Sequence, residues 1–264
     1  MLAFSKKARR EVLRAKPPPE AWRAIVDKNV PYAAWLDAED RRELWALVQI
    51  FLAEKHFEGC GGLSMTEEMK VTIAAQACLL LLHRPNDVYP DLETILVYPH
   101  PYRAHDERRA GAVLVESEGA RLGESWTRGI VVLAWDHVRA ATHPATDGHN
   151  LVLHEFAHQL DAEGGAMNGA PPLDGPIRYE SWARVLGAEF AALSERLQQG
   201  LASDVDPYGA TSPAEFFAVI TEMFFERPAQ LARRHPDLYA ELVAFYRQDP
   251  AALQGRAAST TKAE

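Results

Sequence analysis

The sequence is poor in cysteine and has no long apolar run. Its two cysteines, Cys60 and Cys78, are isolated in 264 residues. This predicts free thiols rather than a disulfide framework or a cysteine metal cluster. No apolar run is long enough to span a bilayer, since the leucine run 79–82 is stopped at once by the segment 83–85.

Positive charge is also scarce. Lys and Arg number 28 against 37 Asp and Glu, which gives a formal net charge of −9. This balance argues against a nucleic-acid-binding surface and against binding to anionic membranes. Basic residues at the N-terminus are not followed by an apolar signal core. We therefore expect a cytoplasmic protein that binds neither nucleic acid nor membrane directly.

One motif in the sequence carries recognisable chemistry, His154-Glu155-Phe156-Ala157-His158. Residues four apart share one face of a helix, so both imidazoles can bind one zinc ion. Glu155 is rotated off that line. It can therefore hold and deprotonate a metal-bound water without acting as a ligand.

The neighbouring residues predict that the motif lies on a buried helix. Asn150 is a candidate N-cap, and the glycines 164–165 can end the helix. An unpartnered buried polar group costs roughly 2–7 kcal/mol, so all three polar side chains of the motif need partners. A pair of core histidines bonded to backbone or to Glu155 is the alternative to a metal site. It suits one histidine better than three clustered polar groups.

A catalytic zinc site needs three protein ligands and a water. In one class of zinc peptidase the third ligand is a histidine six residues after the second. Position 164 is glycine here, so that class is excluded. A glutamate from a later helix is the usual alternative, with Glu215 the better candidate and Glu222 its rival. Ser212, Pro213 and Glu215 also fit a helix cap, so spacing alone leaves the choice open. Asp161 is a candidate partner for a ligand histidine or an anchor for the following loop.

The remaining pattern predicts a mostly helical α+β fold with a small sheet before the motif helix. We expect amphipathic helices over residues 1–57, broken at prolines 17–19, and a packed core helix over 66–82. Short strands are expected over 94–98, 111–115 and 129–135. Later helices are expected over 178–199, 213–226 and 236–248. The segment 251–264 has no apolar period, so we expect a disordered tail.

The apolar run 130–135 comes shortly before the motif helix. We expect it to be an edge strand bordering the zinc cleft, where an extended peptide substrate pairs with it. The same near-continuous apolar run fits a central strand equally well.

Several stretches resemble the Mlc titration factor A family of zinc peptidases. They are residues 148–161 around the motif, 212–217, 68–77 and 123–126. The resemblance covers roughly residues 20–250, and the motifs occur in the same order.

The active site of that family is similar to the gluzincin domain of anthrax lethal factor. That domain has the same His-Glu-Phe-x-His core and a tyrosine seven residues before a ligand glutamate. The resemblance implies that His154, His158 and Glu215 bind one zinc ion. It also implies that Glu155 is the general base and that Tyr208 donates a hydrogen bond to the oxyanion.

The resemblance further implies one zincin-like metallopeptidase domain over residues 1–250, with weak aminopeptidase-type activity on small peptides. The family is named for sequestering Mlc, a DNA-binding repressor of sugar-uptake genes, so a protein-binding regulator is the alternative function. A complete set of ligands, base and donor favours catalysis, because a binding protein needs neither Glu155 nor Tyr208. A structural zinc site is a third alternative, and it would need a fourth protein ligand.

Overall fold

The computed structural model describes residues 5–101, 129–142 and 148–261. The expected strand 111–115 and the motif at 123–126 lie outside these residues. The two cysteines are free thiols, as predicted. In the described part of the chain, no helix is long and apolar enough to cross a membrane.

The sheet is small and parallel, with its three described strands in the order β1-β2-β3. These are β1 His56–Gly59, β2 Thr94–Tyr98 and β3 Ile130–Ala134. Parallel strands need a crossover connection, and the buried helix α4 (Glu67–Leu79) supplies one between β1 and β2. Among the described residues β3 pairs with β2 alone, and its place at the edge of the whole sheet stays a prediction.

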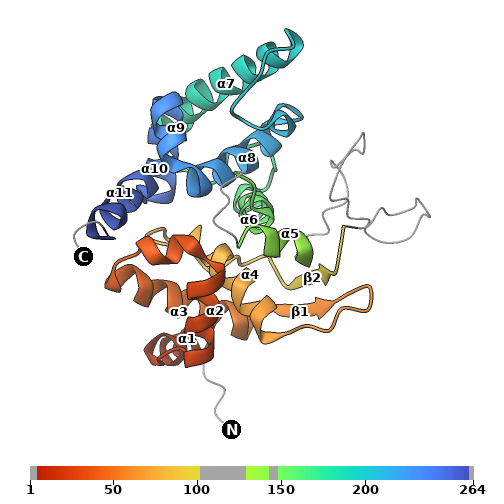
Figure 1. Cartoon of the computed structure of the whole chain (residues 1–264), viewed down its shortest axis with the longest axis vertical. Helices are drawn as coiled ribbons and strands as arrows, with labels where there is room; N and C mark the ends of the chain where they lie inside the picture. The colour runs from red at the N-terminus through yellow and green to blue at the C-terminus, as the bar shows by residue number, and fades with distance from the viewer. Residues whose placement is uncertain (1–4, 102–128, 143–147, 262–264) are drawn as a thin grey trace.

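Four helical segments precede and flank β1 in the chain and form the lower layer of Figure 1 with α4 and the sheet. The prolines 17–19 separate the first two, as predicted, because proline has no backbone N–H for a helix interior. The segments are α1 Lys6–Ala15, α2 Glu20–Asn29, η1 Pro31–Trp35 and α3 Ala38–Glu54.

The C-terminal half is a second helical layer, and each of its elements begins with proline. Proline suits the first position of a helix because its φ is already helical. It lacks a backbone N–H, but an N–H at that position would have no acceptor within the helix. The elements are α7 Pro176–Gln198, η2 Pro207–Ala210, α8 Pro213–Glu226, α9 Pro228–Arg234, α10 Pro236–Tyr246 and α11 Pro250–Thr261.

Helix α11 corrects the expectation that residues 251–264 are disordered, which is wrong as far as residue 261. Asp249 accepts a hydrogen bond from the backbone N–H of Ala252 at 3.0 Å and so caps the helix. Leu253 is buried against the rest of the core. This helix was not predicted because a single buried apolar residue makes no periodic pattern in the sequence.

The motif helix α6 (Leu151–Ala162) lies between the two layers (Figure 1). It contacts α4 and β3 on one side and α8 on the other. Its N-cap is Asn150, as predicted, whose side chain accepts the N–H of Leu153 at 3.1 Å. Phe156 packs its ring on Tyr89 and Phe51, which fixes the rotation of the helix about its axis. Because Phe156 faces the lower layer, the histidines face α8.

Candidate active site

Glu215 stands on the first turn of α8, and its backbone and side chain have separate tasks. Its backbone N–H is capped by the Ser212 hydroxyl at 3.2 Å. Its carboxylate reaches α6 instead, where Oε2 lies 3.0 Å from His154 Nε2 and 3.3 Å from His158 Nε2. The helix-cap and metal-ligand interpretations of this segment are therefore compatible.

These three side chains could hold a metal ion. One ligand atom from each of His154, His158 and Glu215 lies within 4.8 Å of the others. His158 and Glu215 are buried, at 2% and 7% exposed. Burial raises the pKa of Glu215, but hydrogen bonds from the two histidines outweigh this and bring it to about 2. A carboxylate that stays ionised beside two imidazole nitrogens is a donor set suited to zinc.

Glu222 contacts the opposite face of the same imidazole. Its Oε1 lies 2.7 Å from His154 Nδ1, and its Oε2 accepts the backbone N–H of Asn150 at 2.5 Å. Glu222, the alternative ligand that the spacing left open, thus lies on the far side of His154, away from the convergent ligand atoms. A carboxylate in this position fixes the tautomer and the orientation of a ligand histidine.

Glu155 follows His154 on α6 and is also buried, at 8% exposed. Among the described residues its Oε2 has no hydrogen-bond partner. Burial raises the pKa of this carboxyl group, while the charges of His154 and His158 act in the opposite direction. A buried carboxyl oxygen with an open hydrogen-bonding position beside two histidines is suited to accept a proton from water.

Tyr208 comes from the short helix η2, which packs on α8. Its ring centroid lies 6.0 Å from that of His154. Burial is the main cause that raises the pKa of its phenol, and the charges of Glu215 and Glu155 add to it. The structure therefore brings together, from three separate elements, the five site residues that the family resemblance implies.

Asp161 anchors the loop after α6, which was one of its two expected roles. Its Oδ2 accepts the backbone N–H of Gly169 at 2.7 Å, and the Gly169 carbonyl accepts the indole N–H of Trp182 at 2.8 Å. Gly169 has a φ of +78°, and a Cβ there would lie 2.3 Å from the carbonyl oxygen of Pro213. The loop thus fixes the start of α8 relative to α6.

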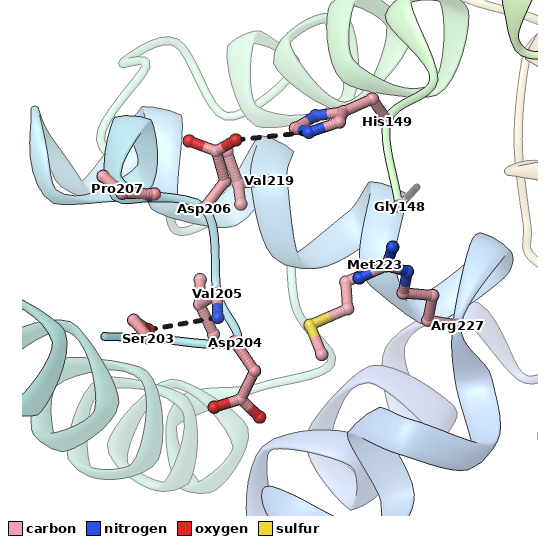
Figure 2. Close-up of a pocket in the computed structure, with 10 residues that line it drawn as sticks. All are labelled: Gly148, His149, Ser203, Asp204, Val205, Asp206, Pro207, Val219, Met223 and Arg227. Carbon is pink, nitrogen blue, oxygen red and sulfur yellow. Dashed lines mark hydrogen bonds and ion pairs between the residues drawn. The ribbon is translucent and has the colours of Figure 1, made fainter. Parts of the chain in front are cut away.

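A cavity of about 230 Å³ lies beside η2, between the segment that leads into α6 and the α8 residues Val219 and Met223 (Figure 2). His149 and Asp206 form an ion pair across its rim, with Nε2 and Oδ2 3.4 Å apart. Met223 and Arg227 of the α8 region line the opposite side. Neither Asp206 nor this cavity was visible in the sequence, because no motif marks them.

Known proteins are similar to this chain over most of its length. The family described as glucose-regulated metallo-peptidase M90 matches residues 4–247. The Synechocystis protein slr2042 is 41% identical, over 92% of this chain and 89% of that relative. Mlc titration factor A of Serratia proteamaculans is 34% identical, over 89% of this chain and 90% of its own length. The protein of the same name from Klebsiella pneumoniae strain 342 is 33% identical, over 84% of each chain.

Proposed function

The chain belongs to the glucose-regulated metallopeptidase family M90, and on this premise we propose that it is a zinc-dependent peptidase. His154, His158 and Glu215 would hold one zinc ion. Glu155 would act as general base and Tyr208 as hydrogen-bond donor to the oxyanion. Aminopeptidase-type cleavage of small peptides in the cytoplasm is the activity that we infer.

One observation carries the proposal. The Nε2 atoms of His154 and His158 converge on one carboxylate oxygen of Glu215, which is 61 and 57 residues away in sequence. Two imidazoles and a carboxylate leave one position of a tetrahedral zinc site open for water, as catalytic sites require. A structural zinc site would need a fourth protein ligand, and no other His, Cys, Asp or Glu joins this group in the described residues.

The side chains of the site divide the work of hydrolysis. Bound zinc would supply Lewis acidity toward the attacking water and the substrate carbonyl. Glu155 takes a proton from the water and passes it to the leaving amine, and its raised pKa makes it a stronger base. The phenol of Tyr208 stays protonated because its pKa is raised, so it donates a hydrogen bond to the tetrahedral oxyanion.

An extended peptide also needs partners for its backbone groups. In the described sheet β3 pairs only with β2, and α6 packs against β3. We therefore propose that the substrate lies along the edge of β3 that has no strand partner in the described residues, where strand addition would give affinity with little side-chain selectivity.

The name of the Serratia and Klebsiella relatives supports a second candidate function. In it the protein binds a repressor of the Mlc type and so takes part in the regulation of sugar uptake. The net charge of −9 suits a basic partner surface. Peptidase activity and repressor binding are compatible in one molecule.

The substitution Glu155→Gln tests the peptidase function. It removes the base but no ligand, so zinc content stays at one per chain while turnover falls by about 10²–10⁴-fold. Metal analysis and hydrolysis of a panel of short peptides measure the two effects. Glu195→Gln, the same change at an exposed position on α7, is the matched control and keeps full activity.

Equal activity in the wild-type protein and the Glu155→Gln variant would show that the hydrolysis has another source. Pull-down of a purified Mlc-type repressor by both proteins separates the two functions. Repressor binding that survives Glu155→Gln shows that regulation does not depend on proteolysis.

A further inference from the structure

Tyr208 lies in a short element that forms few hydrogen bonds of its own. Helix η2 has four residues, Pro207–Ala210. Asp206 caps it twice, because its Oδ1 accepts the Tyr208 N–H at 2.7 Å and its carbonyl accepts the Gly209 N–H at 3.0 Å. The carboxylate of Asp206 therefore holds the backbone of the residue that carries the phenol.

Packing holds η2 against α7 and α8. Gly209 is buried and lies against Leu193 and Val219, where a Cβ would meet both at 3.5 Å. The residues leading into η2 border the cavity of about 230 Å³ (Figure 2). A loop that faces open space is free to shift unless a specific contact holds it.

The same carboxylate also reaches across to the start of the motif helix. Asp206 Oδ2 lies 3.4 Å from His149 Nε2, as the dashed line in Figure 2 marks. His149 precedes Asn150, which caps α6 and donates its N–H to Glu222. One side chain thus connects the Tyr208 loop with the end of the helix that carries both histidines.

We propose that Asp206 is a positioning residue that directs the Tyr208 phenol toward the metal centre. This rests on the proposed zinc-peptidase function. The cap on the Tyr208 N–H is the main contact, and the pair with His149 is secondary because exposed ion pairs contribute little. Asn at 206 keeps an oxygen for the cap, whereas Ala at 206 removes both contacts.

The test measures the position of Tyr208 directly. The full chain is labelled with 3-fluorotyrosine, and the Tyr208 resonance is assigned with Tyr208→Phe. Zinc shifts this ¹⁹F resonance in the wild-type protein and in Asp206→Asn. In Asp206→Ala the shift is lost. Asp204→Ala is the control from the same loop, because the Asp204 carboxylate faces Arg234 and His235.

Kinetics give a second reading. Asp206→Ala lowers kcat by about 10–100-fold, the usual effect of displacing a catalytic group by about 1 Å, and leaves KM nearly unchanged. In the Tyr208→Phe background the same change has no further effect, because there is no phenol left to position. His149→Gln stays near the wild-type rate.

An unchanged zinc-induced shift in Asp206→Ala overturns the proposal, as does an equal loss of kcat with and without the phenol. If zinc does not shift the Tyr208 resonance of the wild-type protein, the proposal is also overturned. The Glu155→Gln comparison still tests the peptidase function independently. If Asp206→Ala does not fold, Asp206→Gly replaces it, because glycine is a tolerated N-cap that lacks the carboxylate.

Discussion

At the scale of single residues, Glu222 supports the proposed metal site without being one of its ligands. Glu222 binds Nδ1 of His154 and the backbone N–H of Asn150, and it is only 5% exposed. As a proposed zinc ligand, His154 would have to present a lone pair on Nε2 to the metal. A hydrogen bond from Nδ1–H to a carboxylate selects that tautomer.

Replacing Glu222 is therefore expected to lower the affinity for zinc rather than to remove a catalytic group. Glu222→Gln is expected to weaken zinc affinity by about 10–100-fold, measured by competition with a chromophoric chelator. Glu226→Gln is the control, since Glu226 also contacts Asn150, at 2.9 Å from its Nδ2. Equal affinities for both variants and the wild-type protein would mean that Glu222 only caps α6.

The sequence predicted the two histidines and Glu155 because their geometry is local to one helix. The choice between Glu215 and Glu222 is not local. Both glutamates lie on α8 and both reach His154, one at Nε2 and the other at Nδ1. Only the distance and rotation between α6 and α8 assign them, and no spacing within a sequence encodes that.

At the scale of elements, the relation between α6 and α8 depends on the loop that joins Asp161 to Gly169. The backbone of Gly169 touches Pro213 at the start of α8, in a conformation with positive φ that disfavours any side chain. Pro213 stands two residues before Glu215. A displaced loop would therefore move the carboxylate that the histidines contact.

Gly169→Ala should lower both stability and metal affinity. The backbone conformation alone costs about 1–3 kcal/mol, and the clash at 2.3 Å with the Pro213 oxygen adds to it. Urea unfolding and zinc titration measure the two effects. Gly165→Ala shares the positive φ, with no atom within 4 Å of its Cβ, so it isolates the strain from the clash. Identical losses in both variants would argue against the contact with α8.

Long elements were predictable, and short ones were not. The helices over 178–199, 213–226 and 236–248 agree with α7, α8 and α10 to within two residues at each end. Strand β1 was not predicted because its four residues alternate between exposed and half-buried and so form no apolar run. It is ordered by pairing with β2, 38 residues further along the chain at the register His56 to Thr94.

At the scale of the whole molecule, one imidazole joins three segments of the C-terminal layer. His235 stands between α9 and α10, with Nδ1 2.8 Å from Glu189 on α7 and Nε2 3.4 Å from Asp204 in the loop before η2. The hydrogen bond with Glu189 is the main cause that raises the pKa of this histidine. The protonated form is thus favoured in the folded chain.

The pH dependence of stability follows from the direction of this shift. The pKa of His235 is higher in the folded state than its ordinary value of 6.5, so its stabilisation is complete below that value. The stabilisation is lost as the pH rises through the folded-state pKa. Urea unfolding of the wild-type protein and His235→Gln should differ more at pH 6 than at pH 9. His100→Gln, at an exposed ion pair, controls for loss of an imidazole, and a gap that widens with pH would contradict the assignment.

The two halves of the metal site are also separated in time during synthesis. The chain leaves the ribosome from its N-terminus, and Glu215 follows His154 by 61 residues. At roughly 5–20 residues per second, that interval is on the order of 3–12 s. Until α8 emerges, the nascent chain has two imidazoles without the carboxylate that completes the set. Two imidazoles offer a metal ion fewer ligands than the complete proposed set, so the completed fold decides which ion is retained.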